Sequence, residues 1–142
     1  MKISLNKLLL IILFILNVSC KSGSNITDTS PPPNLDEGLW NVYYDVSVPI
    51  AGFQFEVNEG NIINASGGAA TEAGFSVSNS SSTVLAFSLS GAIIPSGTGI
   101  LISLEIEGDS NLFCIKDLVL SNIGGDSIPA IIENCNTIIY LE

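Results

Sequence analysis

The chain has 142 residues and a formal net charge of −10 at pH 7, with 14 acidic side chains, four basic side chains and no histidine. The absence of histidine excludes a Ser-His-Asp triad, a Cys-His nucleophile and a histidine-based zinc site. Beyond residue 20 only Lys21 and Lys116 are basic, too few to neutralise the phosphates of a nucleic acid. We therefore expect one domain that is not an enzyme and has no nucleic-acid partner.

Residues 1–19 are predicted to be a lipoprotein-type signal peptide. Two lysines precede an apolar run over 8–16, which is shorter than the roughly 20 residues of a membrane span, and a serine precedes Cys20. Cys20 resembles the lipidated cysteine of bacterial lipoproteins, although Asn17 stands where those signals usually carry an aliphatic residue. We expect lipidation at Cys20 and a place in the bacterial cell envelope, on the exported side. An ordinary cleaved signal and an uncleaved anchor are the alternatives.

Residues 20–38 are predicted to be a flexible tether. The segment is rich in Ser, Thr, Asn, Asp and Pro, and includes the run Pro31–Pro33. Such a composition cannot bury a core, and its prolines favour an extended chain. The tether would hold the following domain away from the membrane. A proline-rich recognition motif is a weaker alternative, because no PxxP with basic flanks is present.

Residues 39–142 are predicted to form a single all-β sandwich. Short apolar runs alternate with clusters of Gly, Asn, Ser and Asp, without a sustained helical period. About nine strands are expected, at 39–46, 50–58, 61–65, 73–79, 82–90, 99–107, 112–121, 127–132 and 136–141.

The alternation of side chains predicts which face of each strand points inward. In "GFQFEV" the inward set is Phe53, Phe55 and Val57, which leaves Gln54 and Glu56 facing out. Two later strands are expected to bury Leu85, Phe87 and Leu89, and Ile100, Ile102, Leu104 and Ile106, with Leu101 as an exception to the alternation.

Several stretches resemble the cohesin family. They are "VPIAGFQFEV" at 48–57, "ASGGAATEAGFSVSNSSSTVLAFSLSGAIIP" at 65–95 and "IPSGTGILISLEIEG" at 94–108. The resemblance covers roughly residues 40–128. It implies a flattened β-sandwich with jelly-roll topology, related to some carbohydrate-binding modules. It also implies binding without catalysis, because cohesin modules bind dockerin modules through one sheet face.

Cys114 and Cys135 are the two cysteines that follow Cys20. In an exported protein such a pair predicts a disulfide. It would close a loop of about twenty residues and contribute on the order of 3 kcal/mol. Two free thiols are the alternative, and a metal site is a poor one.

Asp109, Asn111 and Asp126 are weak candidates for calcium ligands, with Glu107 nearby in the sequence. Oxygen ligands on turns suit calcium. Neither segment matches a DxDxDG-type loop, however, and Asp and Asn are common in turns for backbone reasons alone. No other cofactor is expected.

Aromatic residues suggest a sugar-stacking surface as an alternative. Trp40, Tyr43, Tyr44 and Tyr140 are the candidates, but adjacent Tyr43 and Tyr44 must point to opposite faces of one strand. Trp40 is expected to cover the edge of the core instead.

The expected function is a non-catalytic, lipid-anchored binding module of the cell envelope that recognises a protein partner. Gln54, Glu56, Tyr43 and Tyr44 are the weak candidates for its binding residues. A carbohydrate-binding module, and a structural or assembly subunit of the envelope, are the alternatives.

Overall fold

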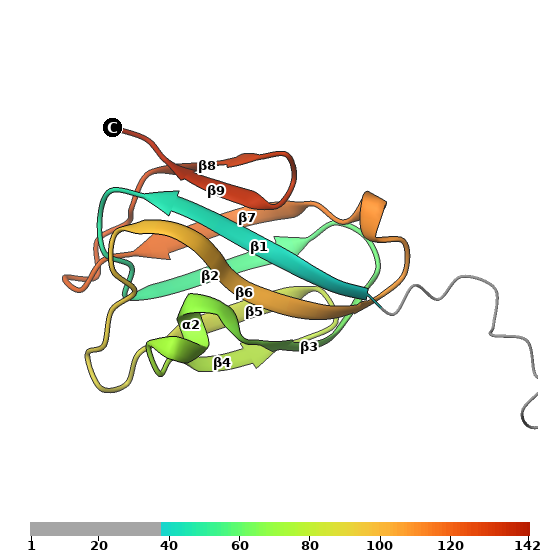
Figure 1. Ribbon diagram of the computed structural model, residues 1–142, viewed down its shortest axis with the longest axis horizontal. Helices are drawn as coiled ribbons and strands as arrows, with labels where there is room; N and C mark the ends of the chain where they lie inside the picture. Colours follow the sequence, from blue (N-terminus) through green and yellow to red (C-terminus); the bar gives the residue numbers. More distant parts are fainter. Residues whose placement is uncertain (1–37) are drawn as a thin grey trace, which may run out of the picture. The chain divides into compact units, whose positions relative to one another are not determined.

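The computed structural model describes residues 38–142, so the predicted signal peptide, Cys20 and nearly all of the predicted tether lie outside the described residues. The described part forms nine strands, and the predicted all-β sandwich is confirmed (Figure 1). The strands are β1 (Gly38–Val46), β2 (Gly52–Val57), β3 (Asn61–Ser66), β4 (Ser76–Asn79), β5 (Thr83–Phe87), β6 (Gly97–Glu107), β7 (Ile115–Ser121), β8 (Ala130–Glu133) and β9 (Thr137–Tyr140).

The strands form two sheets, a five-stranded sheet in the order β3-β6-β1-β9-β8 and a four-stranded sheet in the order β4-β5-β2-β7. In Figure 1, β1 and β6 of the first sheet lie in front of β2 and β5 of the second. Strand β1 pairs antiparallel with β6 and parallel with β9. The jelly-roll topology expected from the sequence stays a prediction.

The core lies between the two sheets, and within residues 38–142 no polar or charged side chain is buried. The predicted inward set of β2 is confirmed, because Phe53, Phe55 and Val57 are all buried. The rings of Phe53 and Phe55 stack with centroids 6.1 Å apart, and Phe53 also stacks on Phe75 at 6.4 Å. At one end of the sandwich Trp40 packs against Phe113.

The face predicted for β5 is wrong. Val84 and Ala86 are buried, whereas Leu85 and Phe87 are 40% and 38% exposed, and Leu89 in the following loop is 80% exposed. The inner positions of β5 lie opposite the two rings of β2, since Val84 pairs with Phe55 and Ala86 pairs with Phe53. Because those rings already fill the inter-sheet space, the inner face of β5 has room only for small side chains.

The face predicted for the start of β6 is also wrong, at one residue. Ile100 is 38% exposed and Leu101 is buried, whereas Ile102, Leu104 and Ile106 are buried as expected. The register with β1 shifts at this point, where Val42 pairs with Ile102 and Tyr43 pairs with Ile100. Leu101 is the extra residue of a β-bulge, and an extra residue reverses the alternation on one side of it.

A short helix, α2 (Gly68–Glu72), was not predicted. It follows β3 and packs along β6, and its residue Ala70 is fully buried (Figure 1). Gly68 has φ +62°, and a Cβ atom there would lie 2.7 Å from the carbonyl group of Leu101. A five-residue helix is too short to be stable alone. Its packing against β6, with Ala70 buried, explains why it forms. Within residues 38–142 no helix has the length and hydrophobicity needed to cross a membrane.

Candidate binding surface on the four-stranded sheet

The outer face of the four-stranded sheet carries three exposed hydrophobic side chains. Leu85, Phe87 and Val119 are 40%, 38% and 52% exposed. Leu85 on β5 and Val119 on β7 lie on either side of Gln54 on the central strand β2. Phe87 on β5 lies opposite Gly52 on β2. Directly paired residues share a face of the sheet. We name these five residues the outer patch.

Gly52 is among the residues that line a shallow depression in the outer patch. The depression measures about 150 Å³ and is walled by the other outer-patch residues and Ser121. A Cβ atom at position 52 would lie 3.0 Å from Ser121 Oγ and 3.7 Å from Phe87 Cβ. The Ser121 hydroxyl donates a hydrogen bond to the Gly52 carbonyl at 3.3 Å. Gly52 is therefore buried, and the Ser121 hydroxyl and Phe87 occupy the space that a side chain at position 52 would take.

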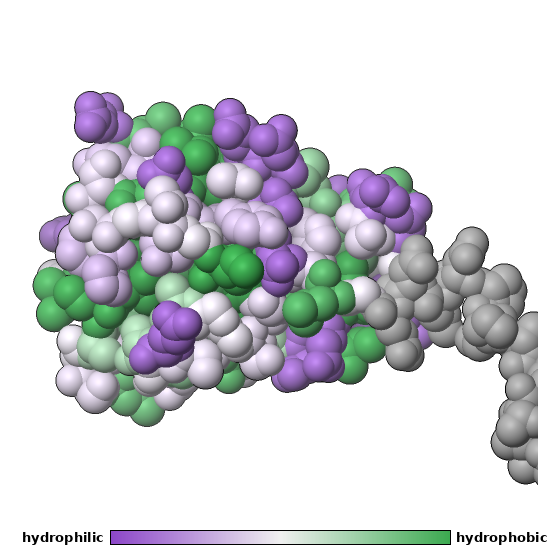
Figure 2. All heavy atoms as spheres, in the orientation of Figure 1, coloured by the Kyte–Doolittle hydropathy of each residue, from purple (hydrophilic) through white to green (hydrophobic). Residues whose placement is uncertain are grey.

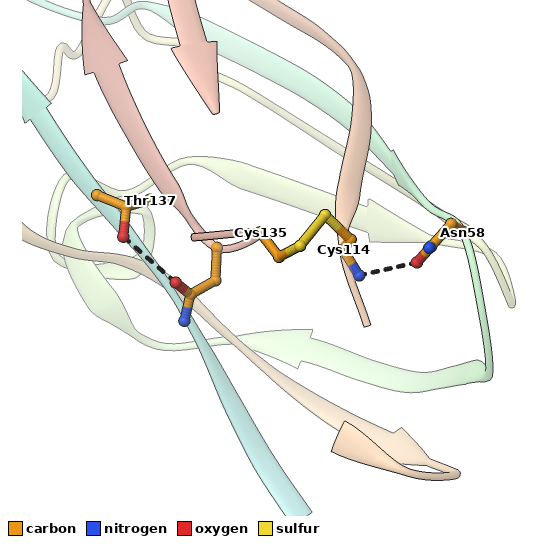
Figure 3. The surroundings of a disulfide bond; sticks show 5 residues. Asn58, Cys114, Cys135 and Thr137 are labelled. Atoms are coloured by element: carbon orange, nitrogen blue, oxygen red, sulfur yellow. Dashed lines mark hydrogen bonds between the residues drawn. A yellow bond between two sulfur atoms is a disulfide. The ribbon is translucent and has the colours of Figure 1, made fainter. Parts of the chain in front are cut away.

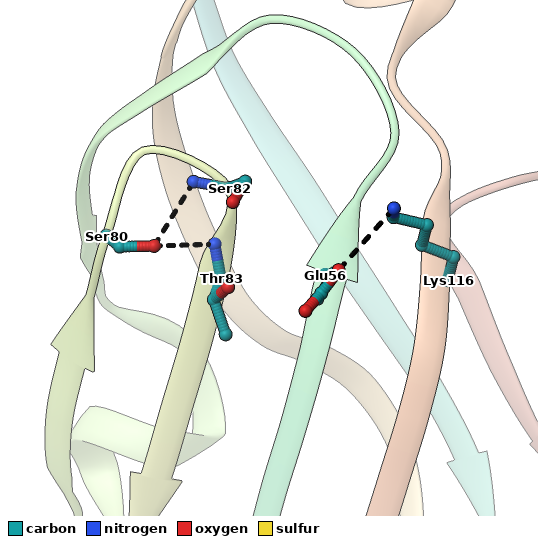
Figure 4. A network of polar contacts seen from close by, with 5 residues as sticks. All are labelled: Glu56, Ser80, Ser82, Thr83 and Lys116. Carbon is teal, nitrogen blue, oxygen red and sulfur yellow. Dashed lines mark hydrogen bonds and ion pairs between the residues drawn. The ribbon is translucent and has the colours of Figure 1, made fainter.

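An ion pair closes one end of this face. Lys116 Nζ on β7 lies 3.4 Å from Glu56 Oε2 on β2, and both side chains are partly exposed (Figure 4). Nearby, the Ser80 hydroxyl accepts hydrogen bonds from the backbone N–H groups of Ser82 and Thr83 and so shapes the turn between β4 and β5. Lys116 is the only basic residue among residues 38–142, and it is paired with Glu56. Every basic side chain of the described part is therefore in an ion pair.

Only some of the predicted binding residues meet here. Gln54 and Glu56 lie on the outer face of the four-stranded sheet as predicted. Tyr43 lies on the outer face of the five-stranded sheet and is 39% exposed. Tyr44 points inward, as the alternation requires, and packs over Gly99.

The aromatic side chains do not form a shared platform in the described part. Tyr43 and Phe87 are the two exposed aromatic side chains of residues 38–142, and they lie on different sheets. Trp40 is buried and Tyr140 is half-buried. Figure 2 shows the side of the five-stranded sheet, where hydrophobic residues form separate small areas among polar ones.

The predicted disulfide between Cys114 and Cys135 is confirmed (Figure 3). Cys114 precedes β7 of the four-stranded sheet, and Cys135 lies in the turn between β8 and β9 of the five-stranded sheet. The bond therefore joins the two sheets. The backbone N–H of Cys114 also donates to Asn58 Oδ1 at 2.8 Å, which fixes the chain after β2 against the start of β7.

The calcium candidates are not brought together. Asp109 Oδ1 accepts hydrogen bonds from the backbone N–H and the side-chain amide of Asn111, both at 2.9 Å, and so caps the short 3₁₀ helix at Ser110–Leu112. Asp126 lies beyond the other end of β7, in a turn organised by the side chain of Asn122. Within residues 38–142 no group of three or more Cys, Asp or Glu side chains is placed to hold a metal ion.

Sequence reasoning missed four of the five outer-patch residues. The signal that pointed to them was the run "TVLAF" in β5, which is apolar on both faces. A run that is apolar on both faces leaves hydrophobic side chains on the outer face, whichever face points inward. No protein-family model, curated protein or solved structure matches this chain.

Proposed function

We propose that this domain is a non-catalytic binding module that docks a protein partner on the outer patch. The observation that carries the proposal is the placement of Leu85, Phe87 and Val119 on one exposed sheet face, on the two strands that flank β2. The core does not need these side chains, because Val84 and Ala86 supply the inner face of β5. Adjacent exposed hydrophobic residues on a regular sheet are typical of an interaction surface.

The charge of the domain indicates the chemistry of the partner. The chain has a formal net charge of −10, and the one basic residue of the described part is paired with Glu56. Such a field repels acidic proteins and attracts basic ones. The partner we propose therefore presents a hydrophobic centre bordered by Lys or Arg. A second copy of this chain fits less well, since it carries the same negative charge.

The resemblance to cohesins supports the same class of function, because cohesin modules bind a protein module through one sheet face. With lipidation at Cys20, the module would act at the exported side of the cell envelope. A carbohydrate-binding role is less favoured, since the exposed rings of Tyr43 and Phe87 lie on different sheets. Catalysis is not part of the proposal.

The test is selection from random peptides displayed on phage. Residues 38–142 form one compact unit with its own core, so this part of the chain is immobilised as the bait. We expect enriched peptides to combine a hydrophobic residue with Lys or Arg. The triple variant Leu85→Ser/Phe87→Ser/Val119→Ser should bind the enriched peptides about tenfold or more weakly than the wild type. The reason is that central hydrophobic contacts dominate the binding free energy of interfaces.

The matched control changes three exposed hydrophobic residues of the other sheet, Tyr43→Ser, Ile100→Ser and Ile131→Ser. It should keep the binding of the selected peptides. Equal retention on both triple variants would contradict the outer patch as the site. Failure to enrich any peptide would leave a structural role in the envelope as the better explanation. Circular dichroism verifies that each variant is folded.

A further inference from the structure

We infer that the hollow between α2 and the start of β6 binds an ammonium or guanidinium group on an alkyl chain, as carried by a Lys or Arg side chain of a protein. The site shares no residue with the outer patch, so binding at one does not require binding at the other.

The hollow consists of two adjoining depressions of about 490 Å³ and 460 Å³. Tyr44, Ala69, Glu72 and Thr98 line both of them. The first depression extends to the loop before β6, and the second extends along β6 itself, which lies beside α2 (Figure 1). Pockets that hold ligands typically measure about 300–1,000 Å³, so each depression has room for one.

Two glycines keep the β6 side of the hollow open. A Cβ atom at Gly97 would meet no atom within 4 Å, and one at Gly99 would meet only Tyr44, in ordinary contact at 3.5 Å. Both glycines are exposed. A group from outside can therefore approach the side chain of Tyr44 over Gly99.

The hydroxyl of Tyr44 belongs to a buried side chain and has no partner. Tyr44 is only 9% exposed, and its hydroxyl forms no hydrogen bond within residues 38–142. No side-chain N or O atom of the described part is both inaccessible and unpaired, so this hydroxyl reaches the solvent, and Tyr44 lines the hollow. The hydroxyl of a buried tyrosine usually has a hydrogen-bond partner. We expect the ligand to supply it, by donating an N–H to the phenolic oxygen.

The charge of the hollow indicates that the ligand is a cation. Glu72 is an exposed carboxylate on α2, and Asp45 on β1 lies opposite Thr98. The ion pair of residues 38–142 joins Lys116 to Glu56, so neither of these two carboxylates has a cationic partner in the described part. No residue that lines the hollow is basic. An anionic ligand would be repelled here, whereas an ammonium or guanidinium group would be attracted.

The walls favour an alkyl chain over a sugar or a metal ion. Ala69, Ala73, Ile93 and Pro95 contribute apolar surface, on which the methylene groups of Lys or Arg can pack. A sugar would lack an aromatic face on which to stack, because the ring of Tyr44 is buried. A calcium ion would find one carboxylate among the lining residues, too few for its usual six to eight oxygen ligands.

The experiment follows amide NMR shifts of the isotope-labelled domain, residues 38–142. The probes are butylammonium and the peptide acetyl-Gly-Lys-Gly-amide, which carries the same group as a side chain. The neutral comparisons are n-butanol and the same peptide with Gln in place of Lys. We expect saturable shifts at residues 69–73 and 97–100 with both cationic probes, and none that saturate with the neutral ones.

Two variants remove the polar groups of the hollow. Glu72→Gln should weaken the binding of both cationic probes by about twofold to fivefold, because it removes one exposed charge interaction. Tyr44→Phe should weaken it by about threefold, through the loss of one hydrogen bond. The matched controls Glu133→Gln and Tyr43→Phe remove the same groups elsewhere on the five-stranded sheet and should keep binding.

The outcomes decide the site and its ligand. Equal shifts with n-butanol, or binding that Glu72→Gln leaves unchanged, would overturn the cation site. Binding of butylammonium without binding of the Lys peptide would overturn a protein side chain as the occupant and leave a free amine as the ligand. The triple-serine variant of the outer patch should bind both cationic probes as the wild type does, so failure of this site and failure of the outer patch are distinguishable.

Discussion

The two outer faces of the sandwich differ in how they carry exposed hydrophobic residues. On the five-stranded sheet, Leu39 lies opposite Glu105, and Asp45 lies between Thr98 and Ile139. Tyr43 and Ile100 are paired and both exposed there, and the polar residues Thr137 and Asp45 lie beside Tyr43. On the four-stranded sheet, by contrast, Leu85, Phe87 and Val119 lie together around Gln54 and Gly52.

This difference shows that exposure alone does not identify a binding face. Isolated exposed hydrophobic residues are normal on soluble proteins. A group of three on β5 and β7, the two strands that flank β2, is not explained by packing of the core. The predictions below test the assignment of inner and outer faces on which this comparison depends.

The largest effect is expected on the inner face of the four-stranded sheet. Phe55 is fully buried and Phe87 is 38% exposed, so the same substitution can be made on both faces. Phe55→Ala should lower the free energy of unfolding by about 3–5 kcal/mol, and Phe87→Ala by about 1 kcal/mol or less. Urea unfolding followed by the fluorescence of Trp40, the single tryptophan, measures both. Equal losses would mean that the two faces are assigned incorrectly.

The β-bulge of the five-stranded sheet provides the next matched pair. Leu101 is fully buried, whereas its neighbour Ile100 is 38% exposed. Leu101→Ala should cost about 2–5 kcal/mol and Ile100→Ala about 1 kcal/mol or less, because only the first leaves a cavity in the core. The same urea titration compares them. A larger loss of unfolding free energy for Ile100→Ala than for Leu101→Ala would contradict the bulge and support an uninterrupted alternation along β6.

Removing the disulfide tests how firmly the two sheets are linked. Cys114 and Cys135 are 21 residues apart in sequence, and their bond connects one sheet to the other. Replacing both by serine should lower the free energy of unfolding by about 3 kcal/mol, mainly through the greater freedom of the unfolded chain. Reducing agent should shift the unfolding of the wild type to the same extent and leave the double variant unchanged. The link would be contradicted if neither reduction of the wild type nor the double substitution lowered the free energy of unfolding.

The smallest effect is expected at the polar end of the four-stranded face. The ion pair between Lys116 and Glu56 is partly exposed. Lys116→Gln should change stability by about 0.5 kcal/mol or less, because solvent screens such pairs. A double-mutant cycle with Glu56→Gln measures the coupling. A coupling of several kcal/mol would show that this end of the face is structural and not an accessible border.

Pattern reasoning on the sequence succeeded where the two faces of a strand differ in polarity. In β2, Gln54 and Glu56 alternate with Phe53, Phe55 and Val57, and the structure places them as predicted. It failed in β5, where both faces are apolar and the period of two residues carries no preference. It also failed at Ile100, since a bulge changes the alternation without changing the composition.

The sequence by itself determined the all-β class, the approximate strand positions and the pairing of Cys114 with Cys135, because turn residues, side-chain alternation and cysteine number are local properties of the chain. Only the tertiary structure decided which face of β5 is exposed. That choice depends on the volume of Phe53 and Phe55 in the neighbouring strand, which leaves space for Val84 and Ala86 but not for larger side chains. The outer patch is the consequence of that packing, and it is the surface on which we propose that a partner binds.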